Sequence, residues 1–270
     1  MVFKRKITMA LAIIVIGAGC FSAGAFKERH STNKGTSALA EKTLKQGSSV
    51  EIEKSPEIQA YLDNAGVKVF AEEKESSLQN LHLTTMITNA GIVYIDPNAG
   101  VMFQQSIPNI LDNSSHKFEP LSKHVVNDFI NAIPNKIIAK APHEKMIVDM
   151  FTDITCGWCQ KVHQNLQEYL DAGITMRFIL YPREGLDGET NVAKKMSTIV
   201  QDSNPLKALQ DAMQGSYVRP AAQVDQTIVN NVTAGAGINV SATPVIIVNG
   251  YIIREYVPAK TLAEVFLDKK

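Results

Sequence analysis

The sequence predicts a mixed α+β and α/β protein with a small N-terminal module, a connecting helix and a larger C-terminal domain. From about residue 140 an apolar strand, an amphipathic helix and a second apolar strand follow one another, which is typical of a mixed sheet covered by helices. Before this domain, a run ending at Pro134 carries apolar residues at helical spacing. At 270 residues the chain is long enough for two modest domains.

Composition limits the partners of the chain. Its 27 basic and 27 acidic residues cancel, and the body of the chain has no long run of one sign. A nucleic-acid surface would show a basic excess, so we expect no nucleic-acid partner. The hydrophobic content of 45% is too high for a disordered chain.

The first residues have the pattern of an export signal. Lys4-Arg5-Lys6 precedes an apolar run over 7–19, and Ala23 and Ala25 form a small-residue cleavage site. We expect residues 1–25 to be a signal peptide that is removed after Ala25. An uncleaved membrane anchor and a lipoprotein acylated at Cys20 are the alternatives, and the chain is exported in each case.

The next segments are a polar leader over 26–49 and a small module over 50–115. We expect a helix within 55–66 and two β-rich runs that form a hairpin around Asn89-Ala90-Gly91. A unit of this size buries little apolar surface by itself. Pairing with a second copy is one way to complete its core.

Residues 116–139 form the linker region, and residues 140–270 form the C-terminal domain. The linker helix has one apolar stripe, which suits either ordinary packing on a neighbour or a connecting arm. The stripe consists of Val125, Val126, Phe129, Ile130 and Ile133. The elements expected after it are a strand over 145–151, one helix from Cys156 to Gly173, a strand over 174–181, a helical insertion over 189–232, a hairpin around Asn249-Gly250, and a helix from Pro258 that buries Leu262, Val265 and Phe266.

The stretch "TDITCGWCQKVH", residues 152–163, holds two cysteines between a buried strand and a helix. Cys156 falls at the helix N-terminus, where unsatisfied backbone N–H groups and the helix dipole favour a thiolate. We therefore predict that the pKa of Cys156 is low and that this residue is the nucleophile. Cys159, almost one turn later, is placed to attack a mixed disulfide formed at Cys156.

Other roles for this motif fit less well. A c-type haem site needs histidine directly after the second cysteine, but Gln160 stands there. Zinc could use both cysteines and His163, yet no second pair of ligands appears at suitable spacing. We expect His163 to be a surface residue of the helix and the protein to need no cofactor. A bridge across two residues closes too small a loop to serve as a structural framework.

Thr243 and Pro244 stand directly before a strand over 245–248, where proline is also a normal edge feature. Together, "FTDITCGWC" and "GINVSATPVIIVNG" resemble the thioredoxin superfamily, in which a Thr-cisPro loop faces the cysteine pair. The stretches "APHEKMIVDMFTDITCGWCQKVH" and "ITMRFILYPREGLDG", with the small N-terminal module, resemble the bacterial periplasmic protein disulfide isomerases of the DsbC/DsbG group.

The resemblance implies a V-shaped homodimer with N-terminal dimerisation domains, linker helices and thioredoxin-like catalytic domains. Cys156 would be the nucleophile and Cys159 the resolving cysteine. Thr243 and Pro244 would form the cis-proline loop that binds the substrate, with Gly157 and Trp158 beside it. The substrates would be misfolded or misoxidised exported proteins in the periplasm, and a membrane thiol reductase would supply the electrons.

The sequence departs from this family at one feature. Some relatives have a second, structural disulfide, but Val200 and Gln223 stand in the corresponding neighbourhoods, so we expect that bridge to be absent.

Two alternative functions stay open. A dithiol oxidase or reductase without isomerase activity is the alternative enzyme. A holdase that binds unfolded chains, with incidental cysteines, is the alternative without catalysis.

Overall fold

The computed structural model describes residues 56–74, 84–96, 101–104, 109–112, 117–120 and 123–267. The predicted signal segment, Cys20 and the polar leader lie outside the described residues. Within the described part, every helix is too short or too polar to span a bilayer.

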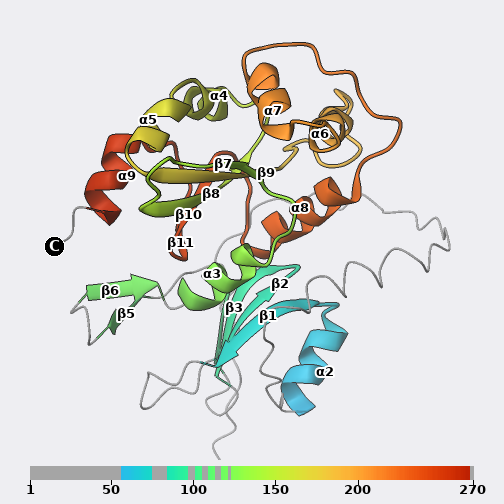
Figure 1. The fold of residues 1–270 in the computed structure, drawn as a ribbon. Coiled ribbons are helices and arrows are strands. Elements are labelled where there is room, and N and C mark those ends of the chain that lie inside the picture. The colour runs from blue at the N-terminus through green and yellow to red at the C-terminus, as the bar shows by residue number, and fades with distance from the viewer. Residues whose placement is uncertain are drawn as a thin grey trace, which may run out of the picture.

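The N-terminal part is a four-stranded antiparallel sheet with one helix beside it (Figure 1). The predicted hairpin is confirmed, because Thr88 pairs with Gly91 across a two-residue turn. Gly91 has a φ of +100°, which residues with a side chain rarely adopt. The elements are α2 (Pro56–Asn64), β1 (Val69–Lys74), β2 (Thr84–Thr88), β3 (Gly91–Asp96) and β4 (Val101–Gln104), and the strand order is β1-β2-β3-β4.

Both faces of this sheet are covered, because side chains alternate along its two central strands. Met86 and Val93 point to one face and pack with Leu62 of α2. The neighbouring Ile87 and Ile92 point to the other face and join a larger apolar cluster. The small sheet is therefore attached to the rest of the chain through its second face.

A short antiparallel pair, β5 (Asn109–Asp112) and β6 (Lys117–Pro120), follows the sheet. The predicted border between residues 115 and 116 falls between these two paired strands. A border inside a hairpin would separate hydrogen-bonded partners, so we propose that the N-terminal part ends after Pro120.

Helix α3 (Lys123–Asn131) lies between the N-terminal sheet and the C-terminal domain (Figure 1). Its apolar stripe shares one cluster with Ile87 of the N-terminal sheet and with Phe151 and Ile179 of the C-terminal sheet. The helix thus packs on both neighbours and connects them. Ordinary packing and a connecting role, the two interpretations of the stripe, therefore both apply. The buried stripe residues are those predicted: Val125, Val126, Phe129, Ile130 and Ile133.

The C-terminal domain is built on a five-stranded mixed sheet in the order β11-β10-β8-β9-β7. Its central strands β8 and β9 are parallel, and the other pairs are antiparallel. Because β7 pairs with β9, this sheet begins at Ile137 rather than at residue 140. The strands are β7 (Ile137–Ala139), β8 (Met146–Thr152), β9 (Ile174–Leu180), β10 (Val245–Val248) and β11 (Tyr251–Ile253).

Helices cover both faces of this sheet, as Figure 1 shows. One face carries the main core, in which Val148, Met176 and Phe178 of the strands pack against Val162 and Met196 of the helices. The other face is covered by α3 and the end of α8. The helices are α4 (Gly157–Gln164), α5 (Leu166–Asp171), α6 (Val192–Val200), α7 (Pro205–Met213), α8 (Gln226–Gly237) and α9 (Ala259–Phe266).

A buried charge cluster fixes the end of α3 to the two central strands of the sheet. Arg177 binds both carboxylate oxygens of Asp149 and also donates to Asn131 of α3. Lys136 lies 3.1 Å from the same carboxylate and donates to the carbonyl of Ile130. The carboxylate of Asp149 therefore pairs with two cations, Lys136 of the linker region and Arg177 of the sheet.

Two predictions about the helices are wrong. The single helix expected from Cys156 to Gly173 is two helices, because the N–H of Asn165 bonds to the carbonyls of both Lys161 and Val162 and the helix ends there. Val265, expected inside, is 41% exposed. In α9 the inward stripe contains Ala259 and Leu262, and Val265 lies beside it.

Candidate active site

The turn between β8 and α4 places Cys156 at the start of the helix, as predicted. Cys156 is the N-cap residue, with an extended backbone, and its N–H donates to the carbonyl of Asp153 at 3.0 Å. Its Sγ accepts a hydrogen bond from the N–H of Cys159 at 3.3 Å. A sulfur in this position takes the role of a capping oxygen, and negative charge on it strengthens that bond.

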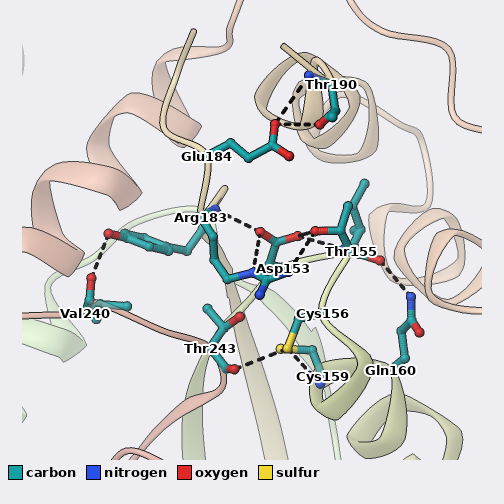
Figure 2. A network of polar contacts seen from close by, with 12 residues as sticks. Asp153, Thr155, Cys156, Cys159, Gln160, Arg183, Glu184, Thr190, Val240 and Thr243 are labelled. Carbon is teal, nitrogen blue, oxygen red and sulfur yellow. Dashed lines mark hydrogen bonds and ion pairs between the residues drawn. The ribbon is translucent and has the colours of Figure 1, made fainter. Parts of the chain in front are cut away.

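The Thr243–Pro244 loop lies against the cysteines although it is far away in the sequence. Strand β10 pairs with β8, with Val245 opposite Phe151, and this pairing brings the loop beside the turn of Cys156. The Cys156 thiol donates to the carbonyl of Thr243 at 3.2 Å (Figure 2). The Thr243–Pro244 peptide bond is cis, as the resemblance implied.

Several groups around Cys156 favour its thiolate. Burial of the sulfur opposes ionisation, but the nearby side chain of Thr243, hydrogen bonding with Cys159 and the charge of Arg183 outweigh it, so the pKa of Cys156 lies below its usual value. The buried Thr243 hydroxyl has no hydrogen-bond partner in the described part of the chain. That hydroxyl is available to donate to a thiolate.

Cys159 has the opposite environment. The residue is fully buried, and this burial raises the pKa of its thiol to about 12, although a backbone hydrogen bond from Asp153 works in the other direction. Negative charge on Cys156 adds to the rise. The pair therefore contains one sulfur that ionises more readily than an ordinary thiol and one that stays a thiol at neutral pH.

Gly157 and Trp158 form the solvent-facing side of the site. Cys156 is only 4% exposed, whereas Trp158 is 62% exposed and stacks on Tyr256 at a ring separation of 5.5 Å. A Cβ at Gly157 would meet nothing within 4 Å, so this side of the sulfur is open. Both residues therefore lie on the exposed side of the cysteine pair.

His163 is buried, so the prediction of a surface position is wrong. Its ring packs on Phe178 at 4.2 Å, and its Nδ1 lies 3.2 Å from the amide of Gln210 on α7. Burial lowers the pKa of His163 to about 3. The spacing from Cys159 and Val162 could have revealed this, because positions i, i+3 and i+4 share one helix face.

The site does not bring together ligands for a metal. Within the described residues, no three His, Cys, Asp or Glu side chains form such a group. The two cysteines of this part are free thiols. Val200, where we expected no second disulfide, packs against the main core as an aliphatic side chain.

Asp153, Thr155 and Arg183 form a polar network beside the cysteines that the sequence analysis missed (Figure 2). Asp153 is fully buried. Arg183 follows β9 and is thirty residues away in the sequence. No local pattern links a carboxylate in one loop with a cation in another.

Comparison with known proteins defines the class and then the family. Residues 134–270 match the family of thioredoxin-like domains. The thiol:disulfide interchange protein DsbC of Salmonella typhimurium is 33% identical over 189 residues, which make up 69% of this chain and 77% of that protein. DsbC of Dickeya dadantii is 33% identical over 196 residues, which are 71% of this chain and 78% of that protein.

The chain therefore belongs to the DsbC family within the thioredoxin-like class, and it is a thiol–disulfide oxidoreductase. Among solved structures, a disulfide interchange protein from Neisseria gonorrhoeae is 21% identical, with a TM-score of 0.43, and covers 49% of this chain and 94% of its own. The family assignment accordingly rests on the sequence relatives and the domain match.

Proposed function

We propose that the protein is an isomerase that reshuffles or reduces incorrect disulfides in exported proteins through Cys156 and Cys159. The observation that carries this proposal is the asymmetry of the two sulfurs. Cys156 has a lowered pKa at a helix N-terminus, whereas the pKa of Cys159 is raised to about 12. Cys156 is therefore suited to attack the substrate, and Cys159 is suited to remain a thiol until it resolves the mixed disulfide.

In the first step, the Cys156 thiolate attacks one sulfur of a substrate disulfide. A new S–S bond forms, the old one breaks, and the other substrate sulfur leaves as a thiolate. If a second substrate thiolate then attacks the mixed disulfide, the substrate is released with a new pairing and Cys156 is again a thiolate. This route consumes no electrons.

The second route uses Cys159. It loses its proton to solvent and attacks the Cys156 sulfur of the mixed disulfide. The S–S bond between Cys156 and the substrate breaks, the substrate sulfur leaves as a thiolate, and a Cys156–Cys159 disulfide remains. Two electrons must then come from a dithiol donor, for which we propose a membrane thiol reductase. The raised pKa of Cys159 slows its attack on the mixed disulfide, so the substrate has time to rearrange.

The open side of Cys156 is the proposed substrate site. Thr243 and Pro244 would contact the substrate backbone, with Gly157 and Trp158 on the other side of the sulfur. Support comes from the exposed ring of Trp158 and from the contact between Thr243 and the nucleophile.

We further propose a homodimer formed by the N-terminal sheet and held in the periplasm after export. Of the two edge strands, β1 contains Glu72, Glu73 and Lys74, and such charges oppose pairing with another strand. Edge strand β4 reads Val-Met-Phe-Gln and carries no charge. We therefore place the dimer contact at β4.

Reactivation of scrambled ribonuclease in a redox buffer tests the function. The wild type should restore activity, and Cys156→Ser should abolish this effect. An enzyme that only oxidises would instead act on reduced ribonuclease and leave the scrambled form inactive. If the Cys156→Ser, Cys159→Ser double variant matched the wild type, a holdase would be the better description.

A further inference from the structure

A fully buried carboxylate lies next to the reactive cysteines. Asp153 occupies the turn between β8 and α4, three residues before Cys156. Its Oδ1 accepts from the N–H and the hydroxyl of Thr155, each at 2.7 Å. Its Oδ2 accepts from the backbone N–H of Arg183 at 2.8 Å and from the Nε at 3.2 Å. Four donors thus fix this side chain.

Arg183 closes the same network from the other side. Its Nη2 donates to the hydroxyl of Thr155 at 3.0 Å, so one guanidinium contacts both Asp153 and the residue directly before the nucleophile. The carbonyl of Asp153 in turn accepts the N–H of Cys156. Figure 2 shows Arg183 reaching down to this turn from above the cysteines.

The charges in this network bear on the nucleophile. A carboxylate in a buried position close to a thiolate opposes ionisation of the thiol, and a paired guanidinium cancels that effect. Arg183 is among the groups that favour ionised Cys156. The other titratable groups near the sulfur act little at neutral pH, because Cys159 stays protonated, buried His163 stays neutral and Lys161 is exposed on α4.

We propose that Asp153 and Arg183 are positioning residues for thiol exchange. The carboxylate holds the turn that presents Cys156, and the guanidinium prevents that carboxylate from opposing the thiolate. This inference rests on the proposed role of Cys156 as the nucleophile.

The test is a double-mutant cycle read out on Cys156 itself. The rate of iodoacetamide alkylation of Cys156 is measured between about pH 5 and pH 9 in the wild type, Arg183→Met, Asp153→Asn, the double variant and Arg183→Lys. Peptide mapping by mass spectrometry assigns the label to Cys156. Arg219→Met, which removes an exposed cation from the helical insertion, is the matched control. Thermal unfolding of each variant reports stability separately.

In Arg183→Met the carboxylate is uncompensated, so the alkylation profile should move to higher pH. The rate at pH 6 should fall roughly threefold to tenfold, while the rate well above the thiol pKa should not change. The double variant should recover most of the loss, because it contains neither charge. Arg183→Lys should lie between the wild type and Arg183→Met, and Arg219→Met should match the wild type.

An unchanged alkylation profile in Arg183→Met, with only a lower unfolding temperature, would show that the ion pair is merely structural and would overturn the inference. Additive losses in the double variant would overturn it as well. The proposed function fails in a different way, namely if wild-type Cys156 shows no reactive thiolate near neutral pH.

Discussion

The Sγ of Cys156 lies 3.2 Å from the carbonyl oxygen of Thr243, a residue 87 positions later in the chain. Each of the two residues is held in place by a different element of the fold. Cys156 is fixed as the N-cap of α4, and Thr243 is fixed by the start of β10, which pairs with β8. The contact therefore depends on the sheet, and the hydroxyl of the same threonine is buried with its donor available for the sulfur.

Thr243→Val removes this hydroxyl and keeps the shape of the side chain. A hydrogen bond to a charged group is stronger than one to a neutral group, so the thiolate should lose more support than the thiol. We expect alkylation of Cys156 at pH 6 to slow by roughly tenfold and its profile to move to higher pH. Thr243→Ser retains the hydroxyl and should stay within about a factor of two or three of the wild type. Equal profiles for the valine and serine variants would show that the hydroxyl plays no part.

Trp158 should report the redox state of the pair through its fluorescence. It is the single tryptophan of the chain, stands between the two cysteines and stacks on Tyr256. Formation of a disulfide changes the sulfurs of the two cysteines that flank Gly157 and Trp158 in the chain, so emission should change between the oxidised and reduced protein. Titration with dithiothreitol buffers measures this change. Tyr256→Leu should alter the absolute emission and leave a redox-dependent difference, and identical spectra in both redox states would contradict the prediction.

The buried His163 should make the fold sensitive to acid. Its folded-state pKa of about 3 lies below the usual value of 6.5, so between these values the unfolded chain binds more protons. The contribution of His163 to stability is therefore complete above about pH 6.5 and is lost as the pH falls towards 3. The slope from this residue can reach about 1.4 kcal/mol per pH unit.

His163→Phe removes this titration and keeps a ring against Phe178. Urea unfolding between pH 4 and pH 8 gives the free energy of unfolding of both proteins. We expect the variant to show a smaller loss of stability in acid than the wild type. Equal slopes below pH 6.5 would mean that His163 titrates normally in the folded protein.

Much of the fold could be predicted because the signals are local. Asn89-Ala90-Gly91 and Asn249-Gly250 both mark hairpins that form, and the apolar stripe of 123–133 is buried as its spacing indicates. The N-cap position of Cys156 follows from the change between strand and helix patterns. These features depend on residues a few positions apart.

The rest depends on contacts between distant segments. His163 is buried because α7, whose Gln210 contacts its ring, packs over that face of α4. The ion pair of Asp153 and Arg183 joins two loops that meet only in the folded sheet. The break at Asn165 could not be predicted, because neither proline nor glycine stands there. The helix ends where the N–H of Asn165 bonds to the carbonyls of both Lys161 and Val162.

The proposed dimer contact at β4 can be tested at Met102, which is 41% exposed on that edge. Met102→Lys would place two like charges across a symmetric strand pair, so the dimer should weaken by about tenfold or more. Sedimentation velocity over a range of protein concentrations measures this. Tyr217→Lys, at an 83% exposed position in the helical insertion, is the control. An unchanged dimer in Met102→Lys would place the contact elsewhere.

A truncation that removes the linker is a poorer test of the dimer. Helix α3 covers Phe151 and Ile179 of the catalytic sheet, so a chain starting at Lys136 would expose that apolar face. Loss of activity in such a chain would mix dissociation with unfolding. A substitution at the edge strand keeps the catalytic domain covered.

The order in which the two sulfurs react tests the proposed mechanism most directly. The reduced protein is treated briefly with substoichiometric iodoacetamide at pH 7, and each cysteine is then quantified by peptide mass spectrometry. We expect label on Cys156 and almost none on Cys159, because the pKa of Cys156 is lowered and that of Cys159 is raised to about 12. Cys159→Ser should keep the reactive Cys156 and accumulate mixed disulfides with substrate. Preferential labelling of Cys159, or equal labelling of both sulfurs, would contradict the proposed roles of the two cysteines.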